Sequence, residues 1–264
     1  MGRSRQLVVA GCCLVLAVTS LTGATAASRL TGRELARPSL RALQLNLCDS
    51  GLAGCYTGRS VARAAEVIRA ERPDIVTLNE VCRDDVSVLE RAMTGRVTSA
   101  FTAAADRSTD GPVRCRNGQP YGIGLLARVL ASADGHRAFD GVYPMQDADD
   151  VEDRVWLCLA AGGFYACTTH LASTSAAVAL GQCGYLLNTV IPALRTRPDP
   201  VVLGGDLNLG AQAQSCLPPG YQRVDDGARQ HIVATGGLTV GARTTISMQG
   251  TTDHPGLLVD LHSE

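Results

Sequence analysis

The sequence contains no lysine, so all 24 of its basic residues are arginine, against 25 aspartate and glutamate residues in a chain of 264. Arg3 and Arg5 belong to an N-terminal export segment, which leaves the exported chain with a net charge of −3 when histidine is neutral. This balance excludes a polycation that coats nucleic acid through charge alone. It does not exclude a nuclease, because a bound metal ion and a few local arginines are enough to hold one phosphodiester.

Aromatic residues are also scarce, with one tryptophan and three phenylalanines in the whole chain. Enzymes that act at membranes are expected to expose apolar aromatic hairpins, so this composition predicts no stable membrane association. The chain shows no internal repeat, low-complexity tract or linker. Its length therefore predicts one domain at residues 39–264, after a short polar lead-in at residues 28–38, and we expect it to be a monomer.

A secretory signal peptide is predicted at residues 1–27. Two arginines lie in the first six residues, an apolar run follows at 7–21, and Ala24, Thr25 and Ala26 match the small-x-small pattern that signal peptidase needs. The apolar run is too short and too poorly flanked to predict a membrane span. We therefore expect a secreted, extracellular protein.

Eight cysteines remain in the exported chain, and none of them forms a Cys-x-x-Cys pair. An even number of cysteines in an exported protein predicts disulfide bonds, and the wide spacings do not favour a zinc site. Cys48 with Cys55, and Cys158 with Cys167, are close enough in sequence to close local loops. The other four are expected to pair among themselves, in a connectivity that the sequence does not specify: Cys82, Cys115, Cys183 and Cys216.

The pattern of apolar residues predicts many short strands and a few helices. Strands are predicted at 40–47, 74–78, 97–103, 121–130, 154–160, 164–170, 201–203, 232–234 and 257–261, and helices at 60–72, 84–93 and 175–194. Residues 134–153 and 218–230 are predicted to be loops, and the glycines at 162 and 163 predict a hairpin that places Cys158 opposite Cys167. Together these elements predict an α+β fold with two β-sheets packed face to face and helices outside.

Seven polar residues lie at or close to the ends of apolar strands: Asn46, Glu80, His170, Asp206, Asn208, Asp253 and His254. Strand ends at one edge of a sandwich converge, so residues far apart in sequence can meet there. Gly204 and Gly205 are expected to bend the chain so that Asp206 and Asn208 emerge on one side. Each residue alone also has a plain explanation as a turn former, a helix-start acid or a strand-end histidine.

As a set, these residues suit metal-dependent chemistry on a phosphate. Glu80 and Asp253, with Asn46 beside them, offer the oxygen ligands that Mg²⁺ or Mn²⁺ prefers. His170 and His254 offer a neutral imidazole as a base toward water and an imidazolium as a donor to developing charge.

Five motifs, taken in order, resemble the endonuclease/exonuclease/phosphatase superfamily, the DNase I-like fold. They are Leu45-Asn46-Leu47, the run from Asp74 to Val81, Thr169-His170-Leu171, Gly205-Asp206-Leu207-Asn208 and Thr252-Asp253-His254. The resemblance covers about residues 40–262, and the order of the five motifs makes it far more specific than any one of them.

The resemblance implies a four-layer α/β sandwich, in which two packed β-sheets carry helices on both outer faces. It also implies a phosphoester substrate that is hydrolysed with a divalent metal ion, Mg²⁺ or Mn²⁺. By resemblance, the metal ligands would be Glu80 and Asp253, with Asn46 assisting.

The same resemblance assigns the remaining residues to the reaction itself. Asp206 and Asn208 would orient the water or leaving group and the phosphate, and His170 and His254 would be the catalytic imidazoles. Arg154 resembles the arginine that binds the substrate phosphate, although a solvated arginine at a strand end is the alternative.

Two departures from the family pattern stand out. Gln230 occupies the position where the family usually has an aspartate that orients a catalytic histidine. Its amide oxygen is expected to accept the imidazole N–H, but without a charge it should make that histidine a weaker base. Residues 120–122 carry no acid where DNase I-like members have a glutamate behind the mid-chain histidine, which argues against DNase I activity itself.

The sequence thus favours a secreted, metal-dependent phosphodiesterase with nucleic acid as its substrate. The second hypothesis is a sphingomyelinase-like or inositol-phosphate-type phosphatase, which the scarcity of aromatic residues makes weaker. A third, from another class, is an extracellular binding protein on a catalytically weakened enzyme fold. Gln230 supports that third hypothesis, and the seven intact polar positions oppose it.

Overall fold

The computed structural model describes residue 2 and residues 39–263, except 110, 130–135, 196–198 and 236. The signal peptide and the lead-in that the sequence predicts, at 1–27 and 28–38, lie outside the described residues apart from Gly2. Ala36–Glu264 forms a single compact unit.

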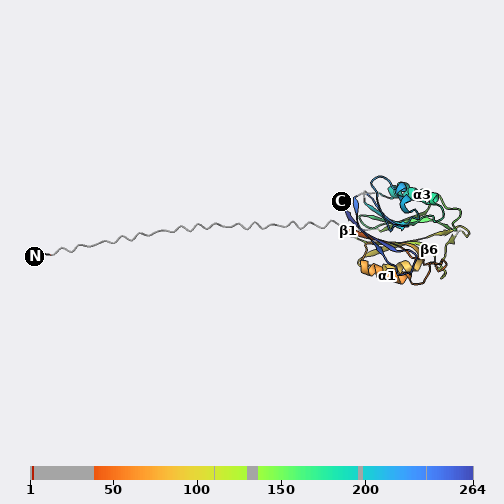
Figure 1. The fold of residues 1–264 in the computed structure, drawn as a ribbon, viewed down its shortest axis with the longest axis horizontal. Helices are drawn as coiled ribbons and strands as arrows, with labels where there is room; N and C mark the ends of the chain where they lie inside the picture. Colours follow the sequence, from red (N-terminus) through yellow and green to blue (C-terminus); the bar gives the residue numbers. More distant parts are fainter. Residues whose placement is uncertain are drawn as a thin grey trace. The chain divides into compact units, whose positions relative to one another are not determined.

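Two six-stranded sheets make up the centre of the domain (Figure 1). The first contains β1 (Ser39–Asn46), β2 (Ile75–Cys82), β3 (Val97–Ala103), β6 (Tyr121–Arg128), β14 (Leu238–Ile246) and β15 (Gly256–Ser263), in the order β14-β15-β1-β2-β6-β3. The second contains β7 (Arg137–Val142), β9 (Val155–Ala160), β10 (Tyr165–His170), β11 (Val201–Asp206), β12 (Gln222–Asp225) and β13 (Gln230–Ala234), in the order β12-β13-β11-β10-β9-β7. A small third sheet, β5-β4-β8, joins β4 (Ala105–Asp106), β5 (Gly111–Pro112) and β8 (Glu152–Asp153).

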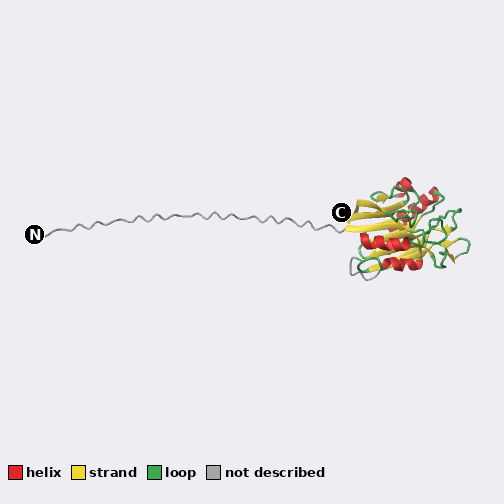
Figure 2. Ribbon diagram, turned by 60° about the horizontal axis from the view of Figure 1, so that its bottom comes forward, coloured by secondary structure: helices red, strands yellow, loops and turns green. Residues whose placement is uncertain are grey.

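The helices lie on opposite sides of the two sheets, as Figure 1 shows for α1 and α3 and Figure 2 shows by element type. On the first sheet are α1 (Ser60–Glu71) and α2 (Arg83–Glu90), and on the second are α3 (Ala176–Tyr185), the π-helical turn η1 (Leu186–Val190) and α4 (Ile191–Leu194). The short 3₁₀ helix η2 (Gly210–Cys216) follows β11. This is the four-layer sandwich of the DNase I-like type that the sequence predicts.

Three apolar clusters hold these layers together. The cluster between the sheets includes Ile75, Leu125 and Val202, while Ile68 and Leu187 belong to the clusters under the first and second helix layers. The helical run Ala176–Leu194 is long enough and apolar enough to span a membrane, judged by length and composition alone. Its packing in the second helix layer gives that apolar character a role within the domain.

The predicted strands and helices are present, but six strands were not predicted. The two-residue strands β4 and β5 lie between the predicted strands at 97–103 and 121–130. β7 and β8 lie in the expected loop 134–153, β12 lies in the expected loop 218–230, and β14 lies in a stretch without a prediction. β7 and β14 are edge strands whose residues are mostly exposed or half-buried, so they lack the apolar alternation that marks a strand in sequence.

The expected bend at Gly204 and Gly205 is wrong, because β11 runs through both glycines and pairs with β10 and β13 along its length. Glycine is needed there for close approach. A Cβ on Gly204 would lie 2.1 Å from the hydroxyl oxygen of Thr77, and one on Gly205 would lie 2.3 Å from the carbonyl oxygen of Thr169. The facing strand β2 and the neighbouring strand β10 therefore both pass close to β11 just before Asp206.

The two predicted local disulfides, Cys48–Cys55 and Cys158–Cys167, are confirmed. The remaining four cysteines pair as Cys82–Cys115 and Cys183–Cys216. Cys158 and Cys167 are directly opposed on the antiparallel strands β9 and β10, as the predicted hairpin requires.

The candidate site is positioned by two pairs of parallel strands. β1 runs parallel to β2 in the first sheet, and β10 runs parallel to β11 in the second. Parallel strands end at the same edge, so Asn46 and Glu80 emerge together, as do His170 and Asp206. The Asp206 backbone N–H donates to Asn79 Oδ1 at 2.6 Å, which joins the two sheets directly at this edge.

Candidate active site

A β-bulge places Glu80 at the site. The β2–β6 ladder shifts register between Asn79 and Val81, and Glu80 between them has a φ of +54°. A bulge turns one residue out of the alternating pattern of the strand. Burial raises the pKa of the Glu80 carboxyl, and the nearby carboxylates of Asp206 and Asp253 act in the same direction, against the hydrogen bond from Asn46.

Asn46 links the carboxylates of the two sheets. Its Nδ2 donates to Glu80 Oε1 at 2.8 Å and to Asp206 Oδ2 at 3.2 Å. Its Oδ1 accepts from the backbone N–H of Cys48 at 3.2 Å. The amide nitrogen of Asn46, and not its oxygen, therefore faces the carboxylates of Glu80 and Asp206.

Asp206 is the most deeply buried carboxylate of the group, with 1% of the residue exposed. Besides Asn46, Gln230 Nε2 donates to its Oδ2 at 2.8 Å, and the backbone N–H of Asn208 donates to its Oδ1 at 3.1 Å. Burial raises the pKa of this carboxyl, although His254 and the hydrogen-bond donors oppose the rise. A buried carboxylate with a raised pKa is suited to taking up a proton during a reaction.

His254 lies against Asp206 and Gln230. Its Nε2 is 3.6 Å from Asp206 Oδ2 and 3.7 Å from Asp253 Oδ1, and its Nδ1 is 3.3 Å from Gln230 Nε2. The expectation that the Gln230 amide oxygen accepts from the histidine is therefore wrong. That oxygen accepts from Gln44 Nε2 at 2.9 Å, so the amide nitrogen faces the ring instead.

His170 is buried at the end of β10, with its Nε2 4.0 Å from Glu80 Oε1. Burial lowers the pKa of this imidazole well below its usual value, and the positive charge of Arg154 lowers it further. The surroundings of His170 therefore favour its neutral form.

Arg154 is buried, which rules out the alternative of a solvated strand-end arginine. Its guanidinium forms ion pairs with Asp150 at 2.6 Å and Glu152 at 2.8 Å. Although burial opposes it, these two carboxylates raise the pKa of Arg154, while burial raises the pKa of Glu152 to about 7. An incoming phosphate would have to share this guanidinium with both acids.

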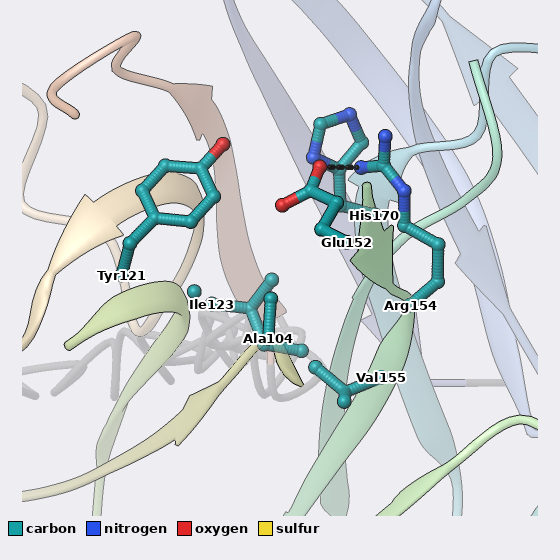
Figure 3. Close-up of a pocket in the computed structure, with 8 residues that line it drawn as sticks. Ala104, Tyr121, Ile123, Glu152, Arg154, Val155 and His170 are labelled. Carbon is teal, nitrogen blue, oxygen red and sulfur yellow. Dashed lines mark ion pairs between the residues drawn. The ribbon is translucent and has the colours of Figure 1, made fainter. Parts of the chain in front are cut away.

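A small cavity of about 10 Å³ lies beside Arg154, between residues of the two sheets (Figure 3). Tyr121 on β6 lines one side of it, and Glu152, Arg154 and His170 line the other. This volume has room for about one water molecule. Tyr121 occupies the 120–122 segment in which the sequence shows no acid, and burial raises the pKa of its phenol well above the usual value.

The remaining predicted residues lie at the rim of the site. Asn208 has a φ of +53° and donates through Nδ2 to the carbonyl oxygen of Leu171 at 3.0 Å, which connects the chain after β11 to that after β10. Asp253 is exposed in the bend that precedes β15, next to the half-buried His254. The structure thus brings together all seven strand-end residues and places Arg154 beside His170.

The donor set fits a hard divalent cation, because Glu80 and Asp253 offer carboxylate oxygens and no thiolate is present. Asn46 would support such an ion by holding Glu80. Within the described residues, two clusters of three potential ligand residues occur, Cys48–Cys55–Asp253 and Asp49–Cys82–Asp85, with ligand atoms within 4.8 Å of one another. Their cysteines are all in disulfides, so neither offers a thiolate.

The sequence interpretation missed two buried amides behind the site, Gln44 and Asn79, and the acids that flank Arg154. Gln44 is fully buried on β1, and its place between Leu43 and Leu45 is the signal that could have drawn attention to it. Asp150 and Glu152 lie within four residues of Arg154. The run of acids is visible in the sequence, but its pairing with Arg154 is not.

A family model described as Endonuclease/Exonuclease/phosphatase family matches residues 45–254. A comparison with curated protein sequences finds no match.

Solved structures share the fold. Truncated TDP2 from Caenorhabditis elegans is 18% identical, with a TM-score of 0.60 over 85% of this chain and 98% of that one. An endonuclease/exonuclease/phosphatase from Beutenbergia cavernae is 21% identical, with a TM-score of 0.62 over 86% and 72%. The human nocturnin catalytic domain with bound sulfate is 17% identical, with a TM-score of 0.65 over 87% and 95%. At such identities the likeness concerns the fold alone.

Proposed function

Because the chain belongs to the endonuclease/exonuclease/phosphatase family, a family of phosphoester hydrolases, we propose that it is a secreted, divalent-metal-dependent phosphodiesterase with nucleic acid as its substrate. The observation that carries this proposal is the hydrogen-bonded group around Asp206. Asn46, Gln230 and His254 reach it from three other segments, and Glu80 and His170 lie directly beside them.

The residues of the group have complementary roles in this proposal. The attacking water lies near Asp206, whose carboxylate accepts its proton. His170 and His254 contact the phosphate, and Asn208 helps to orient it. As the bond from water to phosphorus forms, the bond from phosphorus to the leaving oxygen breaks, and negative charge builds up on the phosphoryl oxygens.

Glu80 and Asp253 would hold the divalent cation, Mg²⁺ or Mn²⁺, which when bound supplies positive charge for the phosphoryl oxygens. Family members commonly use divalent metals. The pKa of Glu80 is raised by burial and by the nearby negative charges of Asp206 and Asp253. A bound cation would stabilise the ionised carboxylate against both effects.

Secretion is proposed on two grounds. The first 27 residues have the composition of a signal peptide, and four disulfides are typical of an oxidising compartment. The domain is proposed to act as a monomer, without stable membrane association.

The test is hydrolysis by the mature, oxidised protein of plasmid DNA, RNA and bis-p-nitrophenyl phosphate, each with Mg²⁺, with Mn²⁺ and with EDTA. We expect metal-dependent cleavage of a polymer that is lost in His254→Ala. Cleavage of the small diester alone would replace nucleic acid by a lipid or small-molecule phosphate. A folded protein inactive on all three substrates would contradict the proposal and favour a binding protein.

A further inference from the structure

We propose that Gln230, itself held by Gln44, is a positioning residue that keeps the hydrogen of His254 on Nε2 and leaves Nδ1 as an acceptor. His254 would then donate a hydrogen bond in the reaction and would not act as its base. The role in the reaction rests on the proposed function, whereas the position of the hydrogen does not.

Asn79, Gln44, Gln230 and His254 form a chain of hydrogen bonds, which we call the amide network. Backbone groups that contact Asn79 set the orientation of the amides in this network. Its Oδ1 accepts from the backbone N–H of Asp206 at 2.6 Å, and its Nδ2 donates to the carbonyl oxygen of Thr169 at 3.0 Å. A backbone N–H only donates and a backbone carbonyl only accepts, so the two ends of the Asn79 amide cannot be exchanged.

The orientation of Asn79 determines that of Gln44. Because Asn79 Oδ1 is an acceptor, the Gln44 atom 2.8 Å from it must be the donor Nε2. The same Nε2 donates to Gln230 Oε1 at 2.9 Å, while Gln44 Oε1 accepts from the Thr77 hydroxyl at 2.5 Å. Gln44 is fully buried, so water offers it no alternative partner.

Gln44 in turn determines the orientation of Gln230. With its Oε1 turned toward Gln44, the Nε2 of Gln230 faces Asp206 Oδ2 at 2.8 Å and His254 Nδ1 at 3.3 Å. Nε2 carries two hydrogens, which is enough to donate to both of these atoms. His254 Nδ1 must therefore accept, and the hydrogen of the neutral ring lies on Nε2.

The second nitrogen of the ring has surroundings that suit a donor. His254 Nε2 lies 3.6 Å from Asp206 Oδ2 and 3.7 Å from Asp253 Oδ1, both carboxylate oxygens. A carboxylate in place of Gln230 would accept a hydrogen from Nδ1 and leave Nε2 bare. The amide of Gln230 reverses that arrangement, so His254 Nε2, which lies beside the carboxylates of the candidate site, carries the hydrogen.

This ring form explains why the proposed reaction uses Asp206, and not His254, as its base. A nitrogen that already carries a hydrogen has no lone pair for the proton of the attacking water, so that proton passes to the Asp206 carboxylate. The Nε2–H of His254 donates a hydrogen bond to a phosphoryl oxygen and keeps its hydrogen while the bond to the leaving oxygen breaks.

The direct test is ¹⁵N nuclear magnetic resonance of the mature protein labelled at its histidines, with His254→Gln used to assign the signal. The two nitrogens of a neutral imidazole give distinct signals according to which one carries the hydrogen. We expect hydrogen on Nε2 of His254 and none on Nδ1. Hydrogen on Nδ1 would overturn the proposal whether or not the protein hydrolyses any substrate.

Two variants separate positioning from general stability. Gln44→Met keeps the side-chain volume but frees the Gln230 amide to turn, so it should mix the two ring forms and lower kcat by about 10- to 100-fold with little change in KM. Gln230→Glu presents only acceptors and should move the hydrogen to Nδ1. A wild-type ring signal in either folded variant would show that other contacts set the ring form and would overturn the proposal.

The matched control is Thr235→Val, because the Thr235 hydroxyl accepts from the backbone N–H of Val201 at 2.9 Å at the opposite end of β11 and β13. It removes one buried hydrogen bond of the same pair of strands without touching the network. We expect this variant to keep the wild-type His254 signal.

Failure of the proposed function can be told apart from failure of the ring assignment. If the wild-type protein shows hydrogen on Nε2 of His254 but hydrolyses nothing, the proposed function fails and the ring assignment stands.

Discussion

Asp206 combines deep burial with three hydrogen-bond donors, from Asn46, Gln230 and the backbone of Asn208. All three favour the ionised carboxylate, whereas burial favours the neutral acid and raises the pKa. The result is a group that is held in place as an acceptor and is still able to take up a proton. These two properties, together with its place at the centre of the candidate site, are why Asp206 is assigned the proton of the attacking water.

Asp206→Asn is therefore predicted to lower kcat by about 100-fold or more, because an amide cannot accept that proton. The substituted side chain has nearly the same shape, so the fold should be retained. The measurement is steady-state hydrolysis of whichever of the three test substrates the wild-type protein cleaves, with circular dichroism as a check of folding. Asp260→Asn, which removes a surface ion pair with Arg41, is the control and should retain activity. Near-normal turnover by Asp206→Asn would remove this residue from the mechanism.

His231 offers a prediction about pH and stability away from the predicted metal ligands. It is fully buried on β13, and its Nδ1 lies 3.0 Å from the Arg223 guanidinium. Burial, with the charge of Arg223, lowers the pKa of this imidazole to about 4. The unfolded chain therefore binds a proton more readily than the folded one as the pH falls from about 6.5.

The stabilising contribution of neutral His231 is thus present above pH 6.5 and is lost as the pH falls toward 4, by at most about 3 kcal/mol. His231→Asn keeps an acceptor for Arg223 and does not titrate. The check is urea unfolding of both proteins at pH 7 and pH 4.5. The loss of unfolding free energy between these pH values should be smaller in the variant, and equal losses would contradict the assigned shift.

At the scale of elements, β11 shows that spacing between strands can matter more than local bending. Gly204 and Gly205 have ordinary strand pairing, but Thr77 from the facing sheet and the Thr169 carbonyl of β10 leave no room for a Cβ. This close approach lets Asn79 of the first sheet accept from the backbone of Asp206 in the second. The glycines therefore set the distance between the two halves of the site.

Gly205→Ala is predicted to destabilise the domain by about 1–3 kcal/mol, because the new methyl group meets a backbone oxygen that cannot move aside easily. Chemical denaturation measures the change. The matched control is Gly184→Ala in α3, where nothing lies within 4 Å of an added Cβ. That variant should be neutral or stabilising by about 0.5–1 kcal/mol, since alanine favours a helix. A neutral Gly205→Ala would show that β10 yields readily.

How much of the fold was predictable depends on how strongly each element is buried. The hairpin with Cys158 and Cys167 follows from short-range signals, namely apolar runs that flank two glycines. β14 does not, because an exposed edge strand is held by backbone hydrogen bonds that impose little on its side chains. Strand existence was therefore predictable where one face is buried, and it was missed at three of the four edges of the two large sheets, with β3 as the edge strand that was predicted.

The site was predictable in membership but not in orientation. The polar residues at strand ends are visible in the sequence, and their order carries the family resemblance. The direction of the Gln230 amide depends on Gln44 and on backbone groups at Asn79, which meet only after the two sheets have packed. Contacts of this kind join residues more than 100 positions apart and have no short-range signature.

For the whole molecule, the site exists only while the two sheets and their helix layers stay together. Disulfides stabilise this arrangement, and a disulfide that closes a longer loop contributes more, because it restricts the unfolded chain more. Cys183–Cys216 spans 33 positions and ties α3 to η2, just beyond the end of β11. Cys158–Cys167 spans nine positions and joins strands that already form a hairpin.

Replacing both cysteines of Cys183–Cys216 by alanine is predicted to lower the unfolding free energy by about 4 kcal/mol, against about 3 kcal/mol for the same change at Cys158–Cys167. All four cysteines are buried, so the loss of side-chain packing is similar in the two variants and the difference reports on loop length. Guanidinium unfolding of both double variants and of the oxidised wild type measures it. The reverse order would mean that the short hairpin bridge, and not the long loop, constrains the unfolded chain.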